Sequence, residues 1–301
     1  MQPIKLKPNS TIGILSTARK ISKKELEAAI AQFEQWGFNV KLGKTIGLED
    51  NQFAGTDKQR LADFQNFLND DEISAIVCAR GGYGTMRIID DIDFTNFIKK
   101  PKWIVGFSDI TVLHSHIFRN YSIPTLHASM PIAFAENSLM AMDTLKKALL
   151  GENYEIEFQH TLEANYKSGK AKGKLIGGNL SLLYALQGSN SDINTNGAIL
   201  FLEDLDEYLY HIDRMILSLK RSGKLKNLAG LIIGGMTNMQ DNRFPFGKNA
   251  EQIIADHTKE FDFPISYHFP AGHISDNRAL IFGQDVELMV TKSATKLSFE
   301  P

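Results

Sequence analysis

The sequence has one cysteine, no long apolar run and almost no net charge, and each absence excludes a class of protein. Cys78 alone cannot form an internal disulfide. It lies in the apolar run 75–79 and is expected to be a small core residue rather than a nucleophile. No stretch approaches the roughly 20 apolar residues of a membrane span, and residues 1–8 lack the features of a signal peptide. We therefore expect a cytoplasmic protein with no membrane partner.

The charge balance also excludes an electrostatic footprint for nucleic acid. The 33 Lys and Arg residues are matched by 35 Asp and Glu, which gives a formal net charge of -2. A small or medium-sized substrate is expected instead. The 301 residues, 43% of them hydrophobic, suffice for one large or two ordinary α/β domains.

Residues 1–150 alternate short apolar runs with segments of helical periodicity. This alternation is typical of a parallel sheet covered by helices on both faces, so we expect a Rossmann- or flavodoxin-like N-terminal domain. The expected strands are residues 11–17, 38–42, 73–80, 102–107 and 123–128. The expected helices are residues 22–36, 57–68, 138–150 and a helix that follows Ser108.

The pattern changes after residue 150. Residues 151–172 are polar without sustained periodicity and are expected to be a linker. Residues 173–301 are then a smaller, β-rich α/β C-terminal domain. Its expected elements are strands at 198–202, 228–234 and 265–269, helices at 208–221 and 247–258, and a hairpin-like tail at 280–299.

Ser108 lies at a turn from strand to helix, in the segment Gly106-Phe107-Ser108-Asp109. A serine held on such a bend exposes its hydroxyl, and the amide of Asp109 can face an oxyanion at the helix N-terminus. The segment resembles a nucleophile elbow, although Ile110 stands where G-x-S-x-G has its second glycine. The alternative is that Ser108 only caps the helix.

The loop Arg80-Gly-Gly-Tyr-Gly84 follows another expected strand and should lie beside Ser108, because loops at the carboxyl ends of parallel strands line one crevice. Adjacent glycines expose amide donors. Gly82 is the preferred second oxyanion donor, with Gly81 as the alternative, and Arg80 could hold a substrate carboxylate. The loop lacks the spacing of a dinucleotide site, and a plain tight turn remains the alternative interpretation.

A serine nucleophile needs a base and a carboxylate to orient that base. His273 stands in a glycine-flanked loop after a strand, and Glu203 stands where the apolar strand 198–202 ends. Asp204, Asp206 and Glu207 could simply be solvated or could favour the N-terminus of the helix that follows. The other seven histidines lack such context and are expected to be structural, and none shows the spacing of a zinc pair. Asn179 is expected to cap a helix, with substrate contact as the alternative.

Together these segments resemble the LD-carboxypeptidase family, the serine peptidases typified by muramoyltetrapeptide carboxypeptidase. The resemblance rests on five blocks in the family's order: residues 80–84, 106–111, 177–183, 202–207 with 212–215, and 272–273. It implies a triad of Ser108, Glu203 and His273, oxyanion donors near Gly82 and Asp109, and neither metal nor cofactor. It also implies a two-domain fold, often as a homodimer.

The function that the resemblance implies is release of the terminal D-alanine from peptidoglycan tetrapeptides during cell-wall recycling. One alternative is a hydrolase of peptidyl- or aminoacyl-nucleotides similar to microcin C self-immunity proteins. Such a site should offer an aromatic platform for the base, and neither Trp36 nor Trp103 lies in the second expected domain. The alternative of another class is a non-catalytic module that binds muropeptides.

Overall fold

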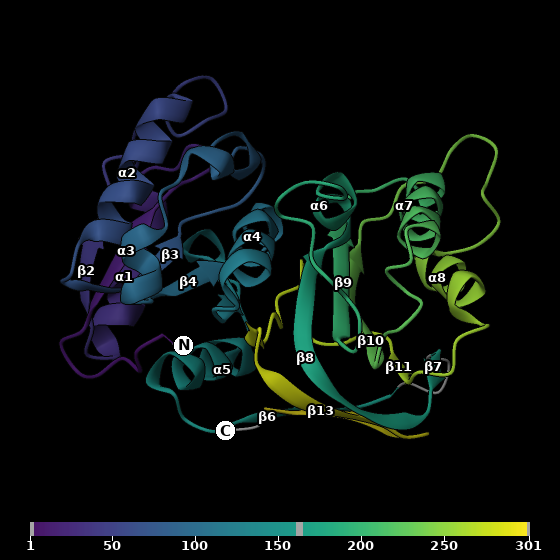
Figure 1. The fold of residues 1–301 in the computed structure, drawn as a ribbon. Helices are drawn as coiled ribbons and strands as arrows, with labels where there is room; N and C mark the ends of the chain where they lie inside the picture. Colours follow the sequence, from purple (N-terminus) through teal and green to yellow (C-terminus); the bar gives the residue numbers. More distant parts are fainter. Residues whose placement is uncertain (1–2, 161–164, 300–301) are drawn as a thin grey trace.

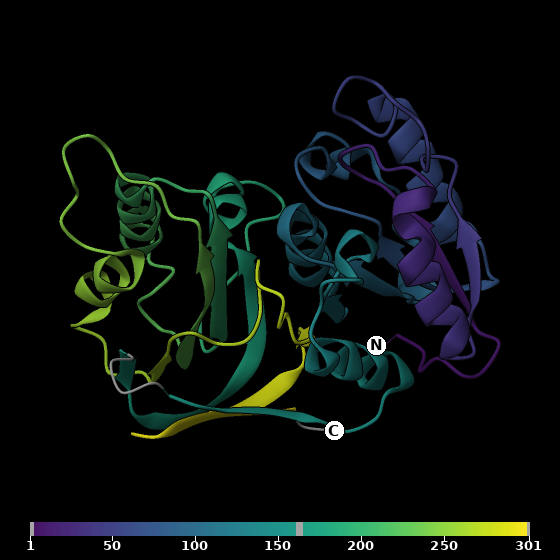
Figure 2. The same cartoon turned by 180° about the vertical axis from the view of Figure 1, so that it is seen from behind.

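The computed structural model describes residues 3–160 and 165–299, which form two lobes, each built around one sheet. Figures 1 and 2 show the lobes side by side, with the N-terminal strands in one and the green and yellow segments in the other. No helix in the described ranges is both long enough and apolar enough to cross a bilayer.

The first sheet has six strands, five of them parallel. In spatial order they are β12 (Leu280–Phe282), β5 (Thr125–His127), β4 (Trp103–Gly106), β3 (Ile73–Cys78), β1 (Thr11–Leu15) and β2 (Asn39–Leu42). Their buried side chains alternate between two apolar clusters, one on each face. The expected covered parallel sheet is confirmed.

Helices cover both faces of this sheet because their apolar stripes face it. One face packs against α1 (Glu27–Gln35) and α5 (Leu139–Leu150), and the other against α2 (Asp57–Asn69), α3 (Thr95–Lys99) and α4 (Thr111–Tyr121). Local chemistry sets their ends. Thr56 and Gln59 form a capping box at the start of α2, and Ser138 caps α5 through the amide of Ala141.

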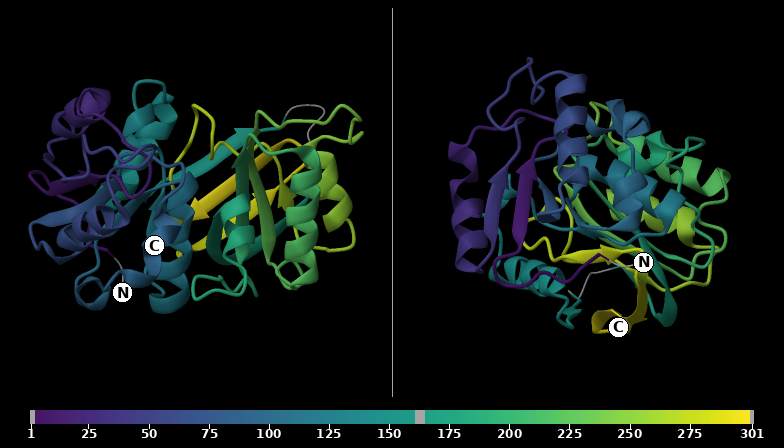
Figure 3. Two further views of the ribbon diagram at one scale, coloured as in Figure 1. Left: turned by 90° about the horizontal axis from the view of Figure 1, so that it is seen from above. Right: turned by 60° about the vertical axis from the view of Figure 1, so that its left-hand side comes forward.

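The second sheet has eight strands. In spatial order they are β6 (Glu155–Gln159), β14 (Ala294–Phe299), β13 (Asp285–Val290), β8 (Gly169–Asn179), β9 (Ile199–Leu205), β10 (Gly230–Thr237), β11 (Ile265–Ser266) and β7 (Tyr166–Lys167). Strands β8 to β11 are parallel, whereas β6, β14 and β13 pair antiparallel. Helices α6 (Leu180–Ala185), α7 (Leu209–Arg221) and α8 (Ala250–Thr258) pack on one face. Helices α7 and α8 lie on the side away from the first lobe (Figure 3).

Two segments differ from the sequence-based expectation. The expected linker contains β6, β7 and the start of β8, since Lys170, Lys172 and Lys174 alternate with small residues as a one-sided strand requires. The expected tail hairpin is β13 with β14, but β12 leaves it to pair antiparallel with β5 of the first sheet. The C-terminal segment therefore joins both lobes.

Candidate active site

Ser108 follows β4 and opens the 3₁₀ turn η4 (Ser108–Ile110), with a φ of +62°. A positive φ is costly for a residue with a side chain and is concentrated at functional sites. The turn can hold Ile110 where G-x-S-x-G has its second glycine, because Gly106 leaves room for the Ile110 side chain. A Cβ at Gly106 would lie 2.8 Å from that side chain. One glycine therefore gives the turn its space. Neither η4 nor α4 has a capping side chain, so the interpretation of Ser108 as a mere cap is wrong.

The glycine loop lies against this turn, as expected from the order of the strands. A Cβ at Gly81 would lie 3.1 Å from Ser108 Oγ, so the main chain there touches the serine. Gly82 is exposed with a φ of +115° and packs against the stem of Arg19. Arg80 turns elsewhere, since its Nη1 donates to the carbonyl of Lys20 at 3.2 Å.

Asp109 follows the serine and is fully buried. Its Oδ2 accepts the amide of Thr85 at 2.9 Å, whereas Oδ1 has no partner among the described residues. Burial raises the pKa of the Asp109 carboxyl, and the hydrogen bonds of Thr85 oppose that shift. The main-chain amide of Asp109 lies at the start of the helical turn, where amides lack intrahelical partners.

Glu203 and His273 come together across 70 residues of sequence. His273 Nδ1 lies 2.6 Å from Glu203 Oε2, and the main-chain amide of His273 donates to the same oxygen at 3.2 Å. Glu203 is fully buried in β9. Gly272 permits the approach, because a Cβ there would lie 2.8 Å from that of Glu203. Burial is the largest single influence and would lower the pKa of His273, but the Glu203 carboxylate together with the charges of Asp204 and Asp206 outweighs it, and the pKa is raised.

Two contacts bring this pair to the serine turn. The Phe107 and His273 rings pack edge to face with centroids 4.8 Å apart. Asn179 lies opposite Glu203 in the β8–β9 register, and its main-chain N–H donates to Thr111 Oγ1 at 2.9 Å. Within the described residues no hydrogen bond joins Ser108 Oγ to the imidazole, a separation that apo active sites commonly show.

The two residues flanking this arrangement have structural partners. Asn179 caps α6 through the amide of Leu182, as expected, and donates Nδ2 to Asp204 at 2.8 Å. The interpretation of Asp204 as solvated is wrong. Asp204 is 2% exposed and also accepts the amide of Ser181. Burial, with a contribution from the Glu203 charge, raises the pKa of Asp204 to about 7.

A separate cavity of about 570 Å³ lies beside α4, away from the serine. Its lining includes His116, but Nδ1 of that ring bonds Ser191 Oγ at 2.9 Å and the ring stacks on Phe94. Ser191 is 2% exposed and is not among the residues that line the cavity, so its hydroxyl is not presented to a ligand there. The Ser108 region therefore remains the candidate site.

Comparison with known proteins gives the family. Residues 12–128 match the model of the LD-carboxypeptidase N-terminal domain, and residues 172–288 match that of the C-terminal domain. A probable murein peptide carboxypeptidase of Bacillus subtilis is 37% identical over 94% of this chain and 89% of its own. A murein tetrapeptide carboxypeptidase of Pseudomonas aeruginosa is 28% identical over 95% and 94%.

A solved structure shares the fold. Muramoyltetrapeptide carboxypeptidase from Oxalobacter formigenes superposes with a TM-score of 0.86 over 97% of this chain and 99% of its own, at 23% identity. The microcin C7 self-immunity protein of Escherichia coli is also similar, with 28% identity over 74% of this chain and 75% of its own. Both domain models together match most of the sequence in the expected order, and the chain belongs to the LD-carboxypeptidase family.

Proposed function

We propose that the protein is a serine-type carboxypeptidase that releases the terminal D-alanine from peptidoglycan tetrapeptides. The observation that carries the proposal is the buried Glu203–His273 pair, which lies beside a serine held on a strained strand-to-helix turn. The names of the murein peptide relatives support the substrate class.

The chemistry is acyl transfer in two halves. His273 Nε2 takes the proton of Ser108 as Oγ attacks the scissile carbonyl, and the imidazolium then protonates the departing D-alanine amine. Water hydrolyses the resulting ester with His273 again as the base, which frees Ser108. Glu203 stays ionised and holds Nδ1–H in the productive tautomer.

The oxyanion of each tetrahedral intermediate needs main-chain donors. We propose the amides of Asp109 and Gly82, with Gly81 as the alternative, because a Cβ at Gly81 would lie 3.1 Å from Ser108 Oγ. For the free carboxylate of the substrate, Arg80 is the candidate from sequence. The bond from Arg80 to Lys20 favours Arg19 instead, which is exposed beside Gly82.

The test is release of D-alanine from a purified murein tetrapeptide by wild-type protein, Ser108→Ala and Ser115→Ala. Ser115 lies on α4 and is 2% exposed, so its variant is a matched control for loss of a serine on the same segment. We expect Ser108→Ala to lose activity by at least about 10⁴-fold while Ser115→Ala keeps it. Full activity in Ser108→Ala would refute the mechanism.

One observation favours the nucleotide hydrolase as a second candidate. Tyr208 and Tyr210 are 43% and 44% exposed just after the Glu203 strand, with ring centroids 5.6 Å apart. They offer a stacking surface that the tryptophans do not. Comparing turnover of the tetrapeptide with that of an aminoacyl sulfamoyl adenylate decides between the two candidates, and we expect the tetrapeptide to be preferred.

We further propose a homodimer that works in the cytoplasm, as is expected for a family that recycles cell-wall peptides. Sedimentation equilibrium should give twice the chain mass of 33.7 kDa.

If the protein is instead a non-catalytic binding module, a phosphonate should fail to label Ser108 and the tetrapeptide should bind without being cleaved.

A further inference from the structure

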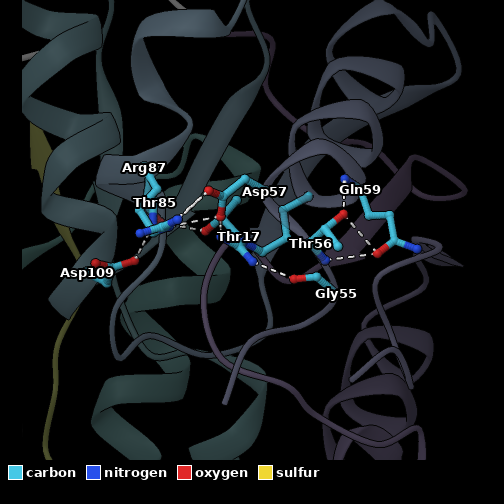
Figure 4. Close-up of polar contacts among 9 residues, drawn as sticks. Thr17, Gly55, Thr56, Asp57, Gln59, Thr85, Arg87 and Asp109 are labelled. Carbon is cyan, nitrogen blue, oxygen red and sulfur yellow. Dashed lines mark hydrogen bonds and ion pairs between the residues drawn. The ribbon is translucent and has the colours of Figure 1, made fainter. Parts of the chain in front are cut away.

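Three loops at the carboxyl edge of the first sheet are tied together by buried side chains. They follow β1, β3 and β4, which are neighbours in the sheet. Thr17 Oγ1 lies 2.7 Å from Thr85 Oγ1, and the Thr85 amide donates to Asp109 Oδ2 at 2.9 Å. All three residues are fully buried. Figure 4 shows this Thr17–Thr85–Asp109 link beside the helix that carries Asp57.

The link fixes the far end of the glycine loop. Gly81 touches Ser108 at the near end, and Thr85 is held by Asp109 only four residues later. Between them Gly84 has a φ of +157°, and a Cβ there would lie 2.8 Å from Ala18 Cα. The loop is therefore clamped between the β1 loop and the serine turn, which leaves its amides little freedom to reorient.

A second anchor lies outside the first. Arg87 ends η2 (Thr85–Arg87) and pairs with Asp57 in a two-pronged contact at 2.7 and 3.0 Å. Arg87 and Asp57 are 44% and 39% exposed, so water and salt screen the attraction between them. The hydrogen bond from the Thr85 amide to Asp109 lies between fully buried residues, where water does not compete for the donor or the acceptor. Asp109 is therefore the stronger clamp.

We propose that the Asp109 side chain is a positioning residue, which holds Thr85 so that the glycine-loop amide and the amide of Asp109 itself converge on one oxyanion. The inference rests on the proposed function. One residue then serves twice, since its main chain donates to the oxyanion while its carboxylate sets the place of the other donor.

The test compares Asp109→Ala with Asp109→Asn. Alanine removes the acceptor for the Thr85 amide, and we expect kcat for D-alanine release to fall about 100-fold with KM within about threefold of wild type, because misplaced donors weaken transition-state binding alone. Asparagine keeps an acceptor oxygen and the volume, so it should restore kcat to within about tenfold. Binding of a phosphonate analogue of the tetrahedral intermediate should weaken in parallel with kcat/KM.

Asp63→Ala is the matched control. Asp63 is also buried and accepts main-chain amides, from Lys44 at 2.9 Å and Thr45 at 2.8 Å, but it holds the loop after the edge strand β2. Its link through Thr45 Oγ1 ends at the main-chain amide of Ser16 and does not include the glycine loop. Asp63→Ala should lower the midpoint temperature of unfolding and leave kcat unchanged. If it lowers kcat as much as Asp109→Ala does, the loss follows general destabilisation and the inference is overturned.

The remaining outcomes separate the inference from the function. Wild-type kcat in Asp109→Ala, beside an inactive Ser108→Ala, would overturn the inference and leave the proposed function standing. An active Ser108→Ala would overturn both. If Asp109→Ala does not fold, Thr17→Val removes the hydroxyl at the other end of the link with little change of shape. It should lower kcat about tenfold, and an unchanged kcat would count against the link.

Discussion

Substituting Glu203 by glutamine is the sharpest test of the acid–base pair. Two donors, Nδ1–H and the main-chain amide of His273, both point at Oε2 of Glu203. An amide nitrogen in that place would face both donors, so the glutamine must turn its oxygen towards His273. The tautomer of His273 is then kept and only the charge is lost. This differs from the case in which an amide flips and enforces the wrong tautomer, which costs about 10⁴ in kcat.

The expected loss can be worked from the change in hydrogen-bond type. A bond to a charged group contributes about 1.5–3 kcal/mol and a neutral one about 0.5–1.5. The difference of about 1–2 kcal/mol corresponds to a fall in kcat of roughly 5- to 30-fold. Glu203→Ala also removes the acceptor and should cost about 10⁴-fold.

The pH profile gives an independent check on the same substitution. His273 must be neutral to accept the proton, and its pKa is raised by Glu203, so kcat/KM of the wild type should rise with pH through a value above about 6.5. In Glu203→Gln the charge is lost and burial lowers the pKa of His273, so the rise of kcat/KM with pH moves to lower pH. Stopped assays of D-alanine release from pH 5 to 9 measure both effects. A glutamine variant as inactive as alanine, with an unmoved pH profile, would refute the reasoning.

Further substitutions test recognition and packing. Arg19→Ala should raise KM for the tetrapeptide about tenfold with little change in kcat. Arg80→Ala should raise KM less, because the Arg80 guanidinium is bonded to the Lys20 carbonyl. If steady-state kinetics give the reverse order, Arg80 is the residue that binds the substrate carboxylate. Gly177→Ala places a Cβ 1.9 Å from the Phe201 carbonyl oxygen and should lower the free energy of unfolding, measured with urea, by more than about 4 kcal/mol. Gly223→Ala is also at positive φ but faces open space, so it should lower the free energy of unfolding by only about 1 kcal/mol. Thr56→Ala removes one half of the α2 capping box and should lower the free energy of unfolding by about 1 kcal/mol.

Local patterns in the sequence were enough for most of the first lobe. Strands β1, β3 and β4 are short buried apolar runs, and each turn that follows them contains the residues that a parallel sheet presents at its carboxyl edge. The Ser108 turn and the glycine loop were predictable for this reason. The positive φ of Ser108 was not, because it arises from packing of the turn and not from residue preference.

The strands whose place was not predicted depend on distant partners. Strand β6 pairs with β14, more than 130 residues later, and β12 adds to a sheet whose other strands end by residue 127. A strand with one polar face carries only a period-two pattern, and in the first half of β8 the positions between the lysines are glycine or alanine, which give little apolar signal. Such segments resemble connectors until the partner strand is known.

Choosing the base shows where sequence reasoning needs tertiary contacts. Four histidines in the described ranges pair with a carboxylate, so pairing alone does not identify a base: the partners are Glu207 for His211, Asp213 for His257, Glu251 for His268 and Glu203 for His273. In the first three pairs the acid is 21–36% exposed, where water screens its charge, whereas Glu203 is fully buried. Burial makes the charge effective, and packing on Phe107 brings the imidazole beside Ser108. Glu203 lies against Gly272 within its own lobe, and only the Phe107 contact crosses to the other lobe. Both features are tertiary contacts, which is why the sequence could suggest His273 as the base but could not separate it from the other paired histidines.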